Sequence, residues 1–157
     1  MAEIEKIHFP SRKNPRLKGF DYSSVNYYFI TICTHNRKCL FGKPGQLNAL
    51  GQIAQQGLAC VADHFPGTRI DKYVIMPNHI HAIVATEISG IHLPTVIGQY
   101  KSFVSREAHK ITSERTIWQA SFHDHIIRSP SSYEKIWLYI ESNPVNWEKD
   151  CFFSDTQ

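Results

Sequence analysis

The stretch Tyr73–Ala85, which reads YVIMPNHIHAIVA, constrains the fold of this chain more than any other. Two apolar runs rich in β-branched residues flank Pro77-Asn78, a pair typical of a tight turn. We therefore expect two strands joined as a hairpin. Side chains alternate between the two faces of a strand, so His79 and His81 should project from the same face.

Two imidazoles held side by side on one strand can bind a single divalent ion, because the backbone fixes their spacing and direction. The predicted second strand would then form half of a metal site, and a third ligand has to come from elsewhere in the chain. The alternative at this point is that His79 and His81 simply line the solvent-exposed face of an antiparallel strand.

Length and composition indicate one globular domain. The chain has 157 residues, 42% of them hydrophobic, and a formal net charge of +3, which is compatible with an anionic partner such as nucleic acid. The four cysteines show no CxxC spacing, and neither a secretory segment nor a run of roughly 18 apolar residues is present. We therefore expect a cytoplasmic protein with no membrane association.

The hydrophobic pattern predicts seven elements. Aromatic and β-branched runs predict strands, and apolar residues at helical spacing predict helices. Their order of strand, helix, strand, strand, helix, strand, helix predicts an α+β fold, namely a four-stranded antiparallel sheet of the ferredoxin-like type with its helices on one face. The predicted ranges are strand 27–34, helix 50–64, strands 70–76 and 79–85, helix 95–111, a short strand within 116–128 and helix 133–142.

A second group of candidate residues lies on the last predicted helix. Tyr139 and Asn143 are four positions apart, so they share one face near the helix C-terminus. A tyrosine hydroxyl with a pKa near 10 is a weak nucleophile, but a neighbouring metal can ease its attack on an electrophile. Asn143 can offer its amide oxygen as the third ligand, and this donor set suits Mg²⁺ or Mn²⁺. The alternative for Tyr139 is a core residue with a bonded hydroxyl.

Several segments resemble the HUH single-tyrosine transposases, and in particular the REP-associated tyrosine transposases. The resemblance extends from about residue 12 to residue 150, and the order and spacing of its motifs are more specific than a lone His-x-His. The segments are Lys18–Tyr22, Tyr28–Arg37, Met76–His81, Gly98–Phe103, Trp118–Gln119, His123–Arg128 and Tyr139–Pro144.

The resemblance implies a ferredoxin-like HUH endonuclease domain that binds Mg²⁺ or Mn²⁺. His79 and His81 match the metal-binding pair, Tyr139 matches the nucleophile, and Asn143 matches a polar position near the metal. The implied activity is cleavage and rejoining of single-stranded DNA at or near hairpins through a 5′-phosphotyrosine, in DNA transposition or in the processing of REP hairpins. The REP-associated relatives imply a monomer in preference to a dimer.

Basic side chains are expected to contact DNA phosphates, and Phe20, Tyr22 and Tyr100 to stack on unpaired bases. The predicted organisation is a basic N-terminal arm at 1–19 that reads the hairpin, a catalytic domain at 20–150 and a C-terminal tail at 151–157. Such charges are also common on an ordinary solvated surface. The candidate DNA contacts are Arg12, Lys13, Arg16, Lys18, Arg37, Lys38, Lys101, Arg106 and Arg128.

The same residues bear on two other functions. A histidine-triad nucleotide hydrolase needs a third alternating histidine, and position 83 is Ile. A non-catalytic module that binds single-stranded nucleic acid on the same fold is the main alternative, although the stacking motif of RNA-recognition domains is absent. Asp124 and His125 lie in a matching segment, where either residue would orient a ligand histidine or cap the fourth strand.

Overall fold

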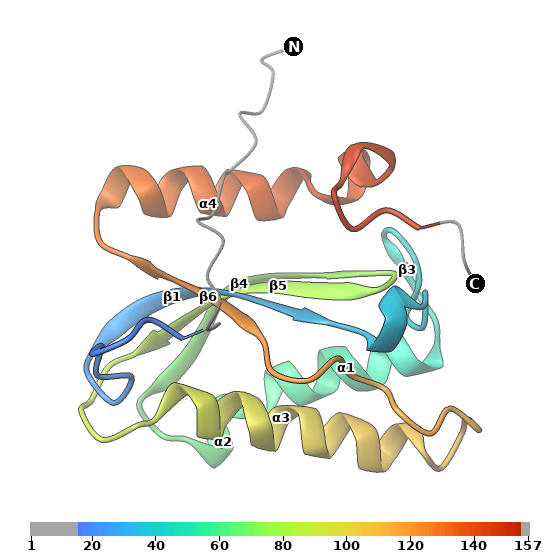
Figure 1. Cartoon of the computed structure of the whole chain (residues 1–157), viewed down its shortest axis with the longest axis horizontal. Helices are drawn as coiled ribbons and strands as arrows, with labels where there is room; N and C mark the ends of the chain where they lie inside the picture. Colours follow the sequence, from blue (N-terminus) through green and yellow to red (C-terminus); the bar gives the residue numbers. More distant parts are fainter. Residues whose placement is uncertain (1–15, 155–157) are drawn as a thin grey trace.

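The computed structural model describes residues 16–154, and a four-stranded antiparallel sheet forms its centre (Figure 1). The strands lie in the order β4-β5-β1-β6, so the first strand of the sheet sits between the hairpin and the last strand. This is the ferredoxin-like order, and it confirms the predicted α+β fold. The strands are β1 (Asn26–Cys33), β4 (Thr68–Met76), β5 (His79–Thr86) and β6 (His123–Ile127).

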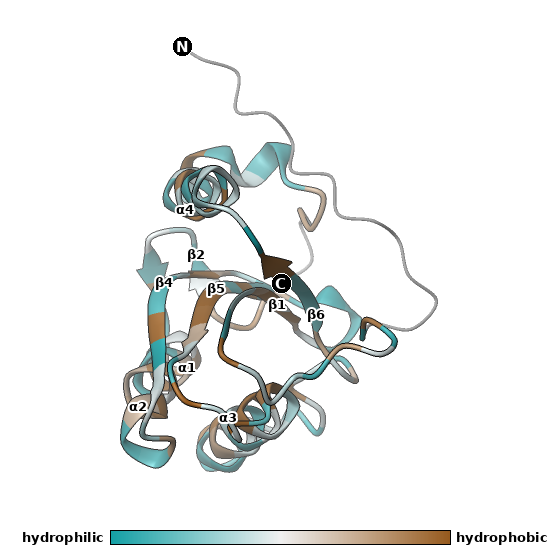
Figure 2. Ribbon diagram, turned by 90° about the vertical axis from the view of Figure 1, so that its left-hand side faces the viewer, coloured by the Kyte–Doolittle hydropathy of each residue, from teal (hydrophilic) through white to brown (hydrophobic). Residues whose placement is uncertain are grey.

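The helices cover both faces of this sheet (Figures 1 and 2). Three of them, α1 (Ala49–Ala59), α2 (Val61–His64) and α3 (Leu93–Ala108), lie on one face, whereas α4 (Pro130–Ser142) lies on the other. The prediction that all helices share one face is therefore wrong for α4. The physical reason is that every residue of β5 is buried, so the second face of the sheet also needs an apolar cover.

The alternation of side chains along the strands separates two hydrophobic cores. Ile80 and Val84 of β5 belong to the larger core beneath α1 and α3. Ile83, which projects from the opposite face, packs with Ile136 and Ile140 of α4 in the smaller core. The face that carries α4 is also the face of His79 and His81, as the period of two predicts.

The β4–β5 hairpin has the predicted two-residue connection. Met76 pairs with His79 across Pro77 and Asn78. The turn is held by neighbouring backbone, because the amide of Thr34 donates to Asn78 O at 2.9 Å and the amide of Leu40 donates to Pro77 O at 2.9 Å. These bonds fix the strand end from which the two histidines start.

Polar contacts on one side of α4 attach it to β4. The register of β4 shifts between Ile70 and Lys72. At this irregularity the Asp71 carboxylate accepts a hydrogen bond from the hydroxyl of Tyr133. Lys72 pairs with Glu141, and its ammonium lies 4.0 Å from the ring centre of Trp137. The bulge thus orients β4 side chains toward α4.

The observed elements differ from the predicted ones in three places. The predicted helix 50–64 is divided at Cys60 into α1 and α2. The segment after β1 forms the 3-10 helix η1 (His35–Arg37) and a small hairpin, β2 (Gly42–Lys43) and β3 (Gln46–Leu47). The chain after α4 forms the 3-10 helix η2 (Pro144–Lys149). Elements of two to six residues show too little periodicity to be recognised in a sequence. Within residues 16–154, no helix is long and apolar enough to cross a membrane.

Candidate active site

The two histidines of β5 lie buried between the sheet and α4. His79 is 0% and His81 is 1% exposed, and their ring centres are 4.6 Å apart. The alternative of two histidines on a solvent-exposed face is therefore excluded. Two buried imidazoles on one face need polar partners, since unpaired polar groups in a core are costly.

Neighbouring side chains satisfy one nitrogen of each imidazole. His79 Nδ1 lies 2.9 Å from Asn78 Oδ1, and His81 Nδ1 lies 2.8 Å from the Thr31 hydroxyl of β1. The Asn78 amide nitrogen donates to the carbonyls of Arg37 and Phe152, so its oxygen accepts and His79 Nδ1 carries the proton. This leaves the lone pair of His79 on Nε2, the arrangement that metal-bound histidines use.

The other nitrogen of each ring faces the interior without a hydrogen bond. Within the described part of the chain, Nε2 of His79 and Nε2 of His81 are buried and have no partner. Burial lowers the pKa of His79 to about 4 and lowers that of His81 well below its usual value, so both rings are neutral at neutral pH. Two adjacent neutral imidazoles with buried, unpaired nitrogens fit a bound divalent cation.

Two oxygen donors reach this pair from the chain after α4. Asn143 caps the C-terminus of α4 and is 3% exposed, and its Oδ1 is buried with no hydrogen-bond partner among residues 16–154. Asp150 follows η2, and its Oδ2 lies 3.9 Å from His79 Nε2. One ligand atom from each of His79, His81 and Asp150 lies within 4.8 Å of the other two.

Sequence reasoning identified Asn143 but missed Asp150, Asn78 and Thr31. Asp150 follows a short 3-10 helix, where no periodicity relates it to the histidines. The Pro77-Asn78 pattern predicts only a turn, although the position of Asn78 next to His79 is a usable signal. Thr31 becomes a partner only through the pairing of β1 with β5, which places it opposite His81.

Tyr139 lies at the same site. Its ring centre is 5.3 Å from that of His81 and 6.1 Å from that of Phe29. Burial, reinforced by the charge of Asp150, raises the pKa of the Tyr139 phenol well above 10, while Asn143 acts in the opposite direction. The phenol is therefore protonated at neutral pH, and forming the phenolate requires added positive charge nearby.

Aromatic rings of the C-terminal segment cover His79. The ring centre of Phe152 lies 4.5 Å from that of His79, and the ring centre of Trp147 lies 6.0 Å away. The guanidinium of Arg37 lies 5.4 Å from the Phe152 ring centre. The segment expected to be a simple tail after residue 150 therefore packs on the candidate site.

Arg16, one of the candidate DNA contacts, has a structural position. Its guanidinium pairs with the buried carboxylate of Asp124 and lies 3.4 Å from the ring centre of Phe122. Asp124 also accepts a hydrogen bond from the Tyr22 hydroxyl at 2.9 Å. It pairs in register with Ile30 and faces the larger core, so the expectation that Asp124 orients a ligand histidine is wrong.

The neighbouring His125 has the opposite orientation. It is in register with Phe29, so it projects from the face that carries α4.

Two of the residues expected to stack on bases, Tyr22 and Tyr100, are buried. Tyr22 is 6% and Tyr100 is 4% exposed, and the Tyr100 hydroxyl donates to Ala54 O at 2.9 Å. The prediction that these two rings stack on DNA is wrong.

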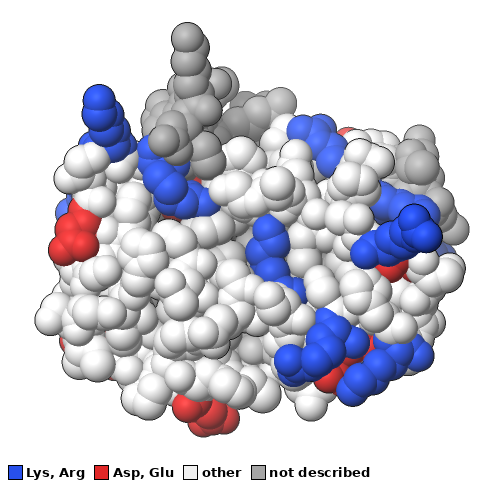
Figure 3. All heavy atoms as spheres, turned by 60° about the horizontal axis from the view of Figure 1, so that its bottom comes forward, with Lys and Arg blue, Asp and Glu red and all other residues white. Residues whose placement is uncertain are grey.

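Two of the remaining candidate cations are held by oxygens of the protein. Lys38 pairs with Glu114, and Lys101 donates to the carbonyls of Gln119 and Ser121 at 2.8 Å each. On the face formed by α1 and α3, Lys and Arg side chains are scattered among acidic and neutral ones (Figure 3). Arg12 and Lys13 lie outside the described residues. Among the described candidate DNA contacts, the exposed residues are Lys18, Arg37, Arg106 and Arg128.

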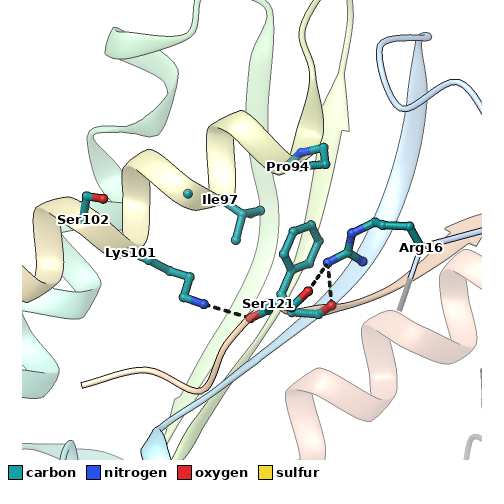
Figure 4. Close-up of a pocket in the computed structure, with 8 residues that line it drawn as sticks. Arg16, Pro94, Ile97, Lys101, Ser102 and Ser121 are labelled. Atoms are coloured by element: carbon teal, nitrogen blue, oxygen red, sulfur yellow. Dashed lines mark hydrogen bonds between the residues drawn. The ribbon is translucent and has the colours of Figure 1, made fainter. Parts of the chain in front are cut away.

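A shallow cavity of about 410 Å³ lies on the side of the sheet away from the histidines (Figure 4). Arg16 and Lys101 border it, and Ile97 and Phe122 form part of its wall. Both cations are held by protein oxygens there. The cavity therefore contributes nothing to the His79–His81 site.

Comparison with known proteins gives consistent matches. Residues 21–143 match the family model described as transposase IS200 like. An uncharacterized protein of Haemophilus influenzae (strain ATCC 51907 / DSM 11121 / KW20 / Rd) is 35% identical to this chain over an alignment of 169 positions. The alignment covers 92% of this chain and 94% of that protein.

Two solved structures share the fold. One, a REP-associated tyrosine transposase bound to a REP hairpin, has a TM-score of 0.66 and 22% identity, with 83% of this chain and 74% of that chain covered. The other, a candidate transposase of Deinococcus radiodurans R1, has a TM-score of 0.54 and 17% identity, with 81% of this chain and 97% of that chain covered.

Proposed function

Because the chain belongs to the IS200-like transposase family, we propose that it is a metal-dependent endonuclease and strand transferase that cleaves single-stranded DNA at or near hairpins. A 5′-phosphotyrosine on Tyr139 is the proposed intermediate. The observation that carries this proposal is the meeting of Tyr139 on α4 with the buried pair His79 and His81 on β5.

The reaction is a phosphoryl transfer that balances without an external energy source. The Tyr139 Oη atom attacks a DNA phosphorus, a bond forms between Oη and phosphorus, and the bond from phosphorus to the 3′ oxygen breaks. The phenolic proton is transferred, directly or through solvent, so that the leaving strand ends in a 3′-OH. Attack by a 3′-OH on the tyrosyl ester reverses the step and joins strands.

The protein groups position this chemistry. His79 and His81 would hold the cation through Nε2, with Asn78 and Thr31 fixing the rings. When bound, a divalent cation would neutralise charge on the phosphate and favour the phenolate. Tyr139, on a helix packed over the sheet, would be held beside this cation, since its ring already lies next to that of His81.

We further propose a DNA hairpin as the partner and a monomer as the acting form. The solved relative bound to a REP hairpin supports the class of partner. The exposed cations Lys18, Arg37 and Arg128 would contact phosphates without reading sequence. Arg12 and Lys13 remain part of the proposed hairpin-reading arm.

The test is a search for a covalent protein–DNA adduct. Labelled single-stranded hairpins from the source genome are incubated with the protein and Mn²⁺ or Mg²⁺, and adducts that survive SDS are resolved by electrophoresis. We expect an adduct with the wild-type chain, none with Tyr139→Phe, and an adduct with Tyr133→Phe. Tyr133 is a matched control because it lies on the same helix and donates to Asp71, away from the histidines.

Each outcome is informative. An adduct that persists in Tyr139→Phe would reassign the nucleophile. Binding of hairpins without any adduct, across both metals, would instead support the alternative of a non-catalytic module that binds single-stranded nucleic acid on this fold.

A further inference from the structure

The Asp150 carboxylate lies in the candidate metal site, although it follows the last residue of the family match. Its side chain is 2% exposed, and its Oδ2 is 3.9 Å from Nε2 of His79. That separation is too long for a hydrogen bond. The carboxylate is thus buried against a nitrogen with which it makes no direct bond.

The backbone around Asp150 fixes the direction of this carboxylate. The Asp150 amide donates to Trp147 O at 3.0 Å, and the Phe153 amide donates to Asp150 O at 3.0 Å. The Phe152 amide donates to Oδ1 of Asp150 at 2.8 Å. With Oδ1 held by its own turn, Oδ2 is the oxygen directed at the histidine pair.

Charge balance favours a cation between these groups. Burying a carboxylate is costly unless an opposite charge compensates it. The nitrogens beside it, Nε2 of His79 and Nε2 of His81, are also buried and make no hydrogen bond among the described residues. Two imidazoles and one carboxylate form a ligand set that holds divalent metals in other proteins.

We propose that Asp150 supplies the third protein ligand, and the one anionic ligand among residues 16–154, to the metal held by His79 and His81. The proposal rests on the metal-dependent function proposed above and deepens it. Ligand atoms of the three residues lie within 4.8 Å of one another. Asn143 then serves as an additional neutral donor, since its Oδ1 is also buried and unpaired within the described residues.

The assignment has a structural consequence. Two ligands come from the central strand β5 and the third from the segment after η2, so metal binding would fasten the chain after α4 to the sheet. This predicts a metal-dependent increase in the melting temperature that depends on Asp150.

The experiment measures Mn²⁺ binding to the EDTA-treated full chain by electron paramagnetic resonance, which counts free Mn²⁺ ions. Asp150→Asn keeps the shape of the side chain and removes its charge. Glu148→Gln is the matched control, because it removes one negative charge from an exposed position in the same segment. We expect the Kd for Mn²⁺ to rise at least about tenfold in Asp150→Asn and to stay within about twofold in Glu148→Gln.

Thermal melting with and without Mn²⁺ provides a second readout and shows that each variant folds. The Mn²⁺-induced rise in melting temperature should be largely lost in Asp150→Asn and retained in Glu148→Gln. If Asp150→Asn binds Mn²⁺ as tightly as the wild type while His81→Gln does not, the role of Asp150 is refuted and the histidine site stands. If the wild-type chain binds no Mn²⁺ in either readout, both this inference and the metal dependence of the proposed function are overturned.

Discussion

The hydroxyl of Thr31 on β1 lies 2.8 Å from Nδ1 of His81 on β5, so the pairing of two central strands fixes the orientation of a candidate metal ligand. A metal at Nε2 of His81 requires that Nδ1 carries the proton, and the Thr31 hydroxyl oxygen can accept the hydrogen bond that this N–H donates. The strand register thus helps to set the tautomer of His81 as well as the orientation of its ring.

Replacing Thr31 by valine should weaken metal binding without disturbing the strand. The substitution keeps the β-branched shape but leaves Nδ1 of His81 without its partner, so we expect a 10- to 100-fold rise in the Kd for Mn²⁺ and a loss of about 1–3 kcal/mol of stability. Thr68→Val is the control, because the buried Thr68 hydroxyl has no partner among residues 16–154. Equal Kd values for the two variants would contradict this role of Thr31.

Asn143→Ala should raise the metal concentration needed for adduct formation, because it removes a buried, unpaired oxygen donor beside the histidines. We expect the half-maximal Mn²⁺ concentration to increase about tenfold. Asn146→Ala is the control, because it makes the same chemical change at a residue whose amide donates to Ser142 O. It should change the half-maximal Mn²⁺ concentration by less than about twofold. An unchanged metal dependence would remove Asn143 from the set of ligands.

Arg16→Ala should destabilise the fold, because it removes the guanidinium that pairs with the buried Asp124 carboxylate. Breaking a buried ion pair in this way should cost roughly 3–5 kcal/mol. Urea unfolding of the variant and the wild type would measure this loss. Lys18→Ala removes an exposed cation and should change the free energy of unfolding by less than about 0.5 kcal/mol. Similar unfolding curves for both variants would show that Arg16 is not structural.

Removing residues 1–15 should weaken hairpin binding, and the truncated chain keeps Arg16, which pairs with Asp124. Loss of phosphate contacts from Arg12 and Lys13 should reduce the slope of log Kd against log salt by roughly 1.4–1.8. The full chain with Arg12→Gln and Lys13→Gln separates the effect of charge from that of the remaining arm. Unaltered affinity of the truncated chain would show that the arm does not read the hairpin.

The stability of the metal-free protein should decrease as the pH falls below neutrality. Burial places the pKa of His79 at about 4 in the folded state, against about 6.5 when unfolded, so the unfolded chain binds protons first. The contribution of His79 is complete above pH 6.5, and on the order of 3 kcal/mol is lost as the pH falls to 4 and below.

Urea unfolding in EDTA between pH 7.5 and pH 4 measures this effect. His79→Gln should flatten the dependence of the unfolding free energy on pH, whereas His123→Gln, at an exposed position, should leave it as in the wild type. Parallel curves for His79→Gln and the wild type would show that His79 is not buried in its neutral form.

The sequence by itself determined the four strands of the main sheet, the longer helices and the direction of the histidines. The alternation around Pro77-Asn78 predicted both strands of the hairpin and placed His79 and His81 on one face, because side-chain direction in a strand depends only on local backbone geometry. The order of elements predicted the antiparallel sheet, and the four-residue spacing placed Tyr139 and Asn143 on one side of α4.

The tertiary structure alone decided which groups meet those histidines. The position of α4 on the second face depends on the burial of β5 from both sides, which no single segment reveals. Strand register places Thr31 beside His81, and the turn after η2 places Asp150 beside His79. Arg16 forms an ion pair with Asp124. Such contacts join residues far apart in the chain, and they are set by packing and charge compensation rather than by local periodicity.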